Sequence, residues 1–115
     1  IQKARLEQAR RRALRTASLQ SLTARAEALQ IQVRGQRERL ALAERRVAIA
    51  RAKLGNEREK YRNGVSTLDD LVRFQQNLDQ TLIGVQRATV ELRVRRAELL
   101  KVSGVLHADL GIQVQ

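Results

Sequence analysis

The sequence predicts an all-α protein in which two long antiparallel helices form a coiled-coil hairpin, and three observations support this. The 115 residues include no Pro and only one Tyr and one Phe, while Ala, Arg, Leu, Gln and Glu dominate, a composition typical of long helices and coiled coils. Apolar residues recur with alternating spacings of four and three on both sides of a single break. That break carries a helix stop signal followed by a helix start signal.

We expect residues 1–61 to form the first long helix. Its first 18 residues are basic and rich in alanine, and the regular pattern begins after them. A 3.5-residue repeat of this length indicates a coiled-coil seam with a left-handed supercoil. Nine of its twelve positions are apolar aliphatic, with Gln36, Glu57 and the final Tyr61 as the exceptions. The positions are Leu22, Ala26, Leu29, Val33, Gln36, Leu40, Ala43, Val47, Ala50, Leu54, Glu57 and Tyr61.

The hairpin tip is expected at residues 62–66. Asn63 and Gly64 tolerate the left-handed backbone that ends many helices, and Lys60 and Arg62 place cations in the last turn, where the helix dipole favours them. The following residues carry the start signal of a second helix, with hydroxyl side chains as N-caps and carboxylates three residues later. These are Ser66 and Thr67 followed by Asp69 and Asp70.

We expect the second helix to cover residues 67–103 and a separate tail to cover 104–115, because Gly104 is suited to end a helix. The predicted seam comprises Leu71, Gln75, Leu78, Leu82, Val85, Thr89, Leu92, Arg96, Leu99, Ser103 and Leu106. A second apolar stripe comprises Val72, Ile83, Val90, Val94 and Ala97. A helix that is apolar on two sides packs on two sides, so we expect the chain to self-associate.

Charge and composition narrow the function classes. The net charge is +11, and residues 1–61 contribute +10 of it. The cluster Arg10–Arg12 lacks the interleaved aromatic residues that stack on bases, so we interpret it as a solvated helix face and expect no nucleic-acid partner. His107 is the single histidine and no Cys is present, so we expect no metal site, no cofactor and no enzymatic activity.

An ordered set of residues around the tip carries a family resemblance. A tyrosine is followed three residues later by a glycine, then by an acidic residue, apolar residues and a Gln-x-x-Leu pair. The residues are Tyr61, Gly64, Asp70, Leu71, Val72, Gln75 and Leu78. Together with the Ala- and Arg-rich stretch 43–61 and the glycine-containing stretch 99–110, this set resembles the outer-membrane efflux protein family, the TolC-like ducts of Gram-negative bacteria. The resemblance spans roughly residues 22–111. Phe74 and Arg73 depart from it, because the family usually has Ala and often a second acidic residue there.

The resemblance implies a role for each part of the chain. Residues 1–61 would descend through the periplasm and 67–103 would return partway, as one hairpin of a trimeric α-helical barrel. The residues expected to dock a periplasmic adaptor, and through it to reach an inner-membrane transporter indirectly, are Tyr61, Arg62, Asn63, Gly64, Val65 and Ser66. Asp69, Asp70 and Arg73 would line the closed periplasmic aperture, where Arg73 can pair with either carboxylate. Helix capping explains Asp69 and Asp70 equally well.

Two other interpretations stay open. The chain could be the coiled-coil hairpin of a periplasmic membrane-fusion adaptor, or a free-standing basic coiled coil that binds nucleic acid through phosphates. No apolar run approaches the ~20 residues of a membrane-spanning helix. Because Ile1 is not a natural start, we expect the chain to be a part of a longer protein.

Overall fold

The structure, a computed structural model, describes residues 1–114, with side chains described as far as Asp109, and it is all-α over this range. Helix α1 spans Gln2–Arg62 and helix α2 spans Leu68–Val114, and no strand occurs among the described residues. The all-α prediction and its division into two long helices are confirmed. The chain separates into two compact units, Arg34–Val94 and Ile1–Val33 with the residues from Arg95 onward, which are described in turn.

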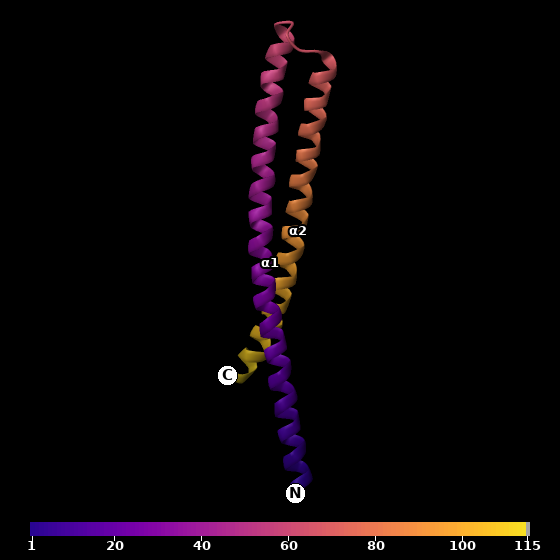
Figure 1. Ribbon diagram of the computed structural model, residues 1–115. Helices are drawn as coiled ribbons and strands as arrows, with labels where there is room; N and C mark the ends of the chain where they lie inside the picture. Colours follow the sequence, from indigo (N-terminus) through magenta and orange to yellow (C-terminus); the bar gives the residue numbers. More distant parts are fainter. Residues whose placement is uncertain (115) are drawn as a thin grey trace. The chain divides into compact units, whose positions relative to one another are not determined.

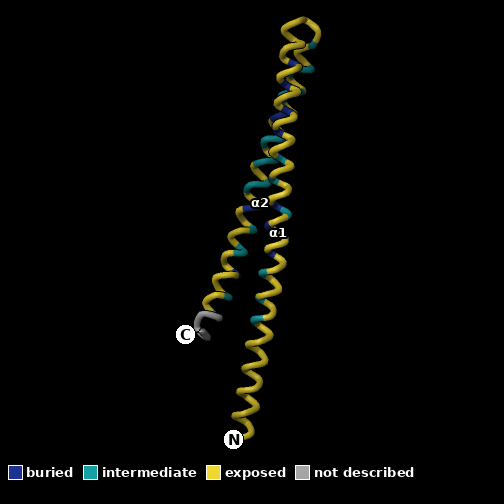
Figure 2. Tube along the Cα trace, turned by 90° about the vertical axis from the view of Figure 1, so that its left-hand side faces the viewer, coloured by how far each residue is buried: buried dark blue, intermediate teal, exposed yellow. Residues whose placement is uncertain are grey.

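The unit Arg34–Val94 is an antiparallel helical hairpin, whose two helices lie side by side below their connection in Figure 1 and overlap in the turned view of Figure 2. Its core is a buried cluster of Val47, Ala50, Leu54 and Leu78. Four partly buried residues of α2 pack against this cluster, namely Leu71, Phe74, Leu82 and Val85. Burying a Leu or Val side chain contributes about 1.5–3 kcal/mol, so this apolar seam is the main force that pairs the helices.

The predicted seam of α1 is confirmed at eleven of its twelve positions, which are buried or half-buried. The polar members Gln36 and Glu57 are each only 9% exposed. The exception is Tyr61, which is 44% exposed. It lies in the last turn of α1, and α2 begins only at Leu68, so the helix pairing does not cover it.

The predicted seam of α2 holds through Leu92 and is wrong after it at two positions. Arg96 and Ser103 are exposed, whereas Arg95 is half-buried and Val102 is buried. After Leu92, successive seam residues of α2 are separated by three and then four positions, whereas the prediction separated them by four and then three. Both registers keep Leu99 and Leu106 in the seam, but the observed one buries the apolar Val102 instead of a serine, which is the more favourable choice.

The predicted end of the second helix at Gly104 is also wrong, and so is the separate tail 104–115 as far as it is described. Helix α2 continues without interruption to Val114. Gly104 keeps a helical conformation, and Gly64 is the one glycine with positive φ in the described part of the chain. A helical glycine costs only about 1 kcal/mol relative to Ala, and no proline follows to stop the helix.

The second unit pairs the N-terminal part of α1 with the C-terminal part of α2. Its buried residues are Leu29 and Val33 of α1 and Val102 of α2. Leu22 of α1 and Val105 of α2 line a shallow hollow with Val102. Residues 1–18 of α1 are all exposed, so this segment forms no part of the core.

Candidate functional site

Helix α1 ends in a complete Schellman motif, which defines one side of the tip. The Val65 N–H donates to the Lys60 carbonyl at 2.8 Å, and the Gly64 N–H donates to the Tyr61 carbonyl at 3.1 Å. These are the 6→1 and 5→2 bonds of the motif, and Gly64 has a φ of +74°. The left-handed residue predicted at this position is confirmed.

Helix α2 begins with Thr67 as its N-cap. The Thr67 hydroxyl oxygen accepts from the Asp70 N–H at 3.2 Å, and the Thr67 carbonyl accepts from the Leu71 N–H. This is the N-cap to N3 bond expected of a threonine cap. Asp69 and Asp70 lie in the first turn, where the helix dipole favours carboxylates.

Ser66 is not an N-cap, contrary to the prediction. Its hydroxyl donates to the Glu57 carboxylate at 2.5 Å, and Glu57 is a buried seam residue in the penultimate turn of α1. The connection is therefore tied back to the helix that precedes it rather than to the helix that follows. Glu57 was predicted only as a polar interruption of the seam, and that interruption of an apolar repeat is the signal that could have identified its role.

The expected docking residues form an exposed surface at the tip. Tyr61, Arg62, Asn63, Gly64 and Val65 are exposed, and Ser66 is half-buried. Val65 is 76% exposed, which is high for a β-branched apolar side chain. Five of the six expected docking residues are thus accessible to a partner.

The expected aperture residues lie one turn apart at the start of α2. Asp69 and Arg73 are exposed and Asp70 is half-buried. The expected pairing of Arg73 with a carboxylate is not present, because the one ion pair within 4.0 Å among the described side chains joins Arg95 to Glu98. All three side chains are consequently free of ion pairs in the described part of the chain.

Both helices of the hairpin unit carry exposed apolar residues on their outer faces. The predicted second stripe of α2 is exposed, with Ile83 at 49% and Val90 at 58%. On α1 the corresponding residues are Leu42 and Ile49, at 49% and 55%. This α1 stripe was missed in the sequence, because its members are separated by charged residues and the inner seam dominates the pattern.

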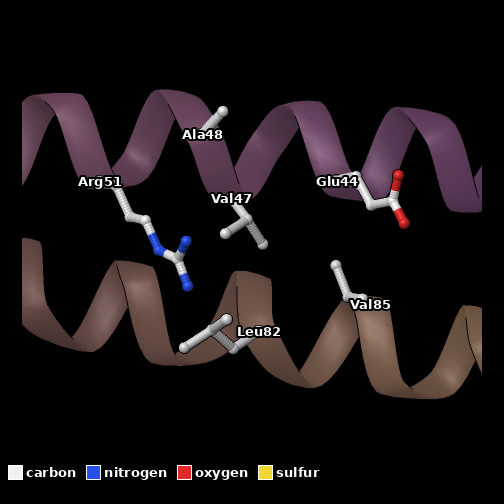
Figure 3. Close-up of a pocket in the computed structure, with 6 residues that line it drawn as sticks. All are labelled: Glu44, Val47, Ala48, Arg51, Leu82 and Val85. Carbon is white, nitrogen blue, oxygen red and sulfur yellow. The ribbon is translucent and has the colours of Figure 1, made fainter.

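The hollows along the hairpin are shallow. Two of them lie in the groove between the helices, and a third lies on α2 alone beside Val90. Figure 3 shows one of them, where Val47 of α1 faces Leu82 and Val85 of α2, with Glu44 and Arg51 along its edge. No group of three or more metal-ligating side chains occurs among the described residues. Over the same range, neither helix has an apolar stretch that is long enough to cross a bilayer.

Comparisons with known proteins identify no relative. Neither family models, nor curated proteins, nor solved structures give a match to this chain.

Proposed function

We propose that this chain is one helical hairpin of a trimeric efflux or secretion duct in the outer membrane of a Gram-negative bacterium, located in the periplasm. In this role it packs side by side with neighbouring hairpins and presents its tip to a periplasmic adaptor. It performs no chemistry. The observation that carries the proposal is the matched pair of exposed apolar stripes on the outer faces of α1 and α2.

The two stripes lie at the same heights along the hairpin. In the inner seam, Val47 faces Leu82 and Val85. Ile49 follows Val47 by two residues and Ile83 precedes Val85 by two, which places each about 130° around its helix from the centre of the seam. Leu42 and Val90 lie one heptad farther from the turn.

This match favours hairpins that stand next to each other without an axial shift. The outer face of α1 in one copy would contact the outer face of α2 in the next, with Ile49 beside Ile83 and Leu42 beside Val90. Such an interface is heterologous, and a heterologous interface generates a ring rather than a filament when its rotation closes without translation. A ring of hairpins is the wall of a helical duct.

The tip supports the second half of the proposal. Its conformation is fixed by the Schellman motif at Gly64 and the Thr67 cap, and it exposes Val65 at its end. A rigid tip with an exposed apolar side chain suits docking to an adaptor, because little ordering is required on binding. In the trimer, Asp69, Asp70 and Arg73 would line the aperture that this tip surrounds.

Two further candidates follow from particular features. The same tip geometry suits a periplasmic adaptor hairpin. Conductance of the full-length protein in planar bilayers separates the two, since a complete duct conducts ions and an adaptor does not. The third candidate, nucleic-acid binding, would depend on the exposed cluster Arg10–Arg12. That candidate predicts a mobility shift that persists at physiological salt and weakens steeply as salt is raised.

Cysteine crosslinking tests the assembly directly, because the chain contains no native cysteine. Two variants, Ile49→Cys and Ile83→Cys, are mixed and oxidised at a concentration at which sedimentation shows association. We expect a disulfide between the two variants, since a disulfide requires Cα atoms within about 7 Å. The pair Leu42→Cys with Val90→Cys should behave in the same way.

The out-of-register pair Ile49→Cys with Val90→Cys is the matched control, and it should remain unlinked. Dimers of Ile49→Cys with itself would indicate a two-fold interface and would rule out the ring. A chain that stays monomeric at tens of micromolar would also contradict the proposal, because it would show that the exposed stripes do not associate.

A further inference from the structure

Glu57 is the buried polar residue of the seam that lies nearest the turn. It is 9% exposed, and it follows the buried apolar residues Val47, Ala50 and Leu54 in the repeat. A carboxylate at such a position weakens helix pairing, because burying it requires desolvation and an apolar residue of similar volume would fill the seam at least as well. Its presence therefore calls for a role other than pairing strength.

The polar partner of Glu57 lies in the connection between the helices. The Ser66 hydroxyl donates to the carboxylate at 2.5 Å, and the Ser66 N–H also donates to the Lys60 carbonyl at 3.3 Å. Ser66 is the residue between the Schellman motif and the Thr67 cap, and neither motif uses its side chain. Its hydroxyl is thus held by Glu57.

Glu57 is shielded by the helix pairing on one side and borders a hollow that is open to solvent on the other. Glu57 lines a hollow of about 280 Å³ beside Phe74, with Lys53 and Lys60 at its edge. Neither lysine forms an ion pair with Glu57 within 4.0 Å. The one ion pair among the described side chains joins Arg95 to Glu98. Ser66 is consequently the residue that gives the Glu57 carboxylate its hydrogen bond.

We infer that Glu57 is a positioning residue for the tip, which it fixes through Ser66 while it weakens the helix pairing around it. Through this bond the buried seam sets the conformation of the surface that the proposed function assigns to docking. The inference depends on that function only for its biological use, because the tip conformation can be measured on the chain alone.

Hydrogen exchange of the tip amides, combined with thermal melting, tests the inference. In Glu57→Leu an apolar side chain replaces the carboxylate next to Leu54 in the seam, so the melting temperature should equal or exceed that of the wild type. The Val65 and Ser66 amides should nevertheless exchange about tenfold faster, the size expected for the loss of one hydrogen bond to a carboxylate. Opposite changes in stability and in tip protection are the signature of a positioning role.

Three further variants isolate the bond. Ser66→Ala should accelerate tip exchange as much as Glu57→Leu, and the double variant should exchange no faster than either single variant, because both remove the same interaction. Glu57→Gln retains an acceptor oxygen but loses the charge that about doubles the strength of the bond, so its tip exchange should rise only about threefold. Gln36→Leu makes the same kind of change at the other buried polar seam position, far from the turn, and should leave tip exchange unaltered.

Wild-type tip exchange in Glu57→Leu would overturn the inference. If tip exchange in Gln36→Leu accelerated as much as in Glu57→Leu, the inference would also be overturned. The acceleration would then result from the loss of any buried polar residue of the seam, rather than from the loss of the bond to Ser66. Crosslinking results that contradict the proposed ring would leave this inference standing, because the exchange rates report the fold of a single hairpin.

Discussion

Gly64 and Gly104 both follow helical sequence, yet only one of them ends a helix. Gly64 has a φ of +74° and closes a Schellman motif, whereas Gly104 lies inside a helix that runs to Val114. An added Cβ would find no atom within 4 Å at either position. The difference is therefore one of backbone conformation rather than of space.

The residues around the two glycines explain the difference. Before Gly64 the last turn contains Lys60 and Arg62, and after it Thr67 caps a new helix. Gly104 is followed by Val105 and Leu106, which offer no cap and continue the apolar repeat. A glycine permits the left-handed conformation, but a stop also requires capping partners and a competing start signal.

The largest difference between the two glycines is expected when each is replaced by valine. Gly64→Val should lower the free energy of unfolding by about 2 kcal/mol, because a β-branched residue is strained at positive φ. Gly104→Val should change it by less than about 0.5 kcal/mol, since Val and Gly differ little in helix propensity. Urea unfolding followed by circular dichroism, at one fixed chain concentration, measures both.

Gly64→Asn is the control for this pair. Asparagine visits the left-handed region more readily than other residues, so this variant should retain most of the stability that Gly64→Val loses. Equal losses for Val and Asn would show that contacts at the tip, rather than φ, determine the requirement for glycine.

A smaller effect is expected from the cap that accompanies the stop. Thr67→Ala removes the acceptor of the Asp70 N–H and should lower the free energy of unfolding by about 1 kcal/mol. Thr67→Ser keeps the acceptor oxygen and serves as the control, with a loss below about 0.3 kcal/mol. A neutral Thr67→Ala would mean that the Schellman motif alone specifies the turn.

The smallest expected effect has the opposite sign. Gly104→Ala should stabilise the chain by about 0.5–1 kcal/mol, because alanine is the better helix former and no neighbouring atom obstructs its Cβ. Gly64→Ala should destabilise it despite equally open space. Thermal melts of the two variants should therefore show changes in melting temperature of opposite sign. Changes of the same sign would show that Gly104 is not helical in solution.

Much of this fold could be predicted from periodicity. The inner seam of α1, the turn at Gly64 and the N-cap at Thr67 are local features, each specified by residues within a few positions of one another. The register of α2 after Leu92 could not be predicted in the same way, because two alternations share Leu99 and Leu106. The choice between them depends on burying Val102 against the other helix, which is a tertiary effect.

At the tip, too, contacts between residues distant in the sequence determine what the local residue types leave open. Ser66 and Thr67 are both acceptable caps by residue type, and the sequence does not rank them. The Ser66 hydroxyl donates to the Glu57 carboxylate, so the Thr67 hydroxyl is the one that caps α2. The outer stripe of α1, with Leu42 and Ile49, is invisible until the inner seam has been assigned and the remaining apolar residues are examined.

The turn at Gly64 also has a consequence for the rate at which the chain folds. Core residues of the hairpin pair across it at increasing separations, with Leu54 and Leu78 24 residues apart and Val47 and Val85 38 apart. Forming the nearest pairs closes the shortest loops, and each further pair then adds to helices that are already aligned. We therefore expect the hairpin to fold outward from its tip, so that the residues that shape this exposed surface also determine how quickly the two helices pair.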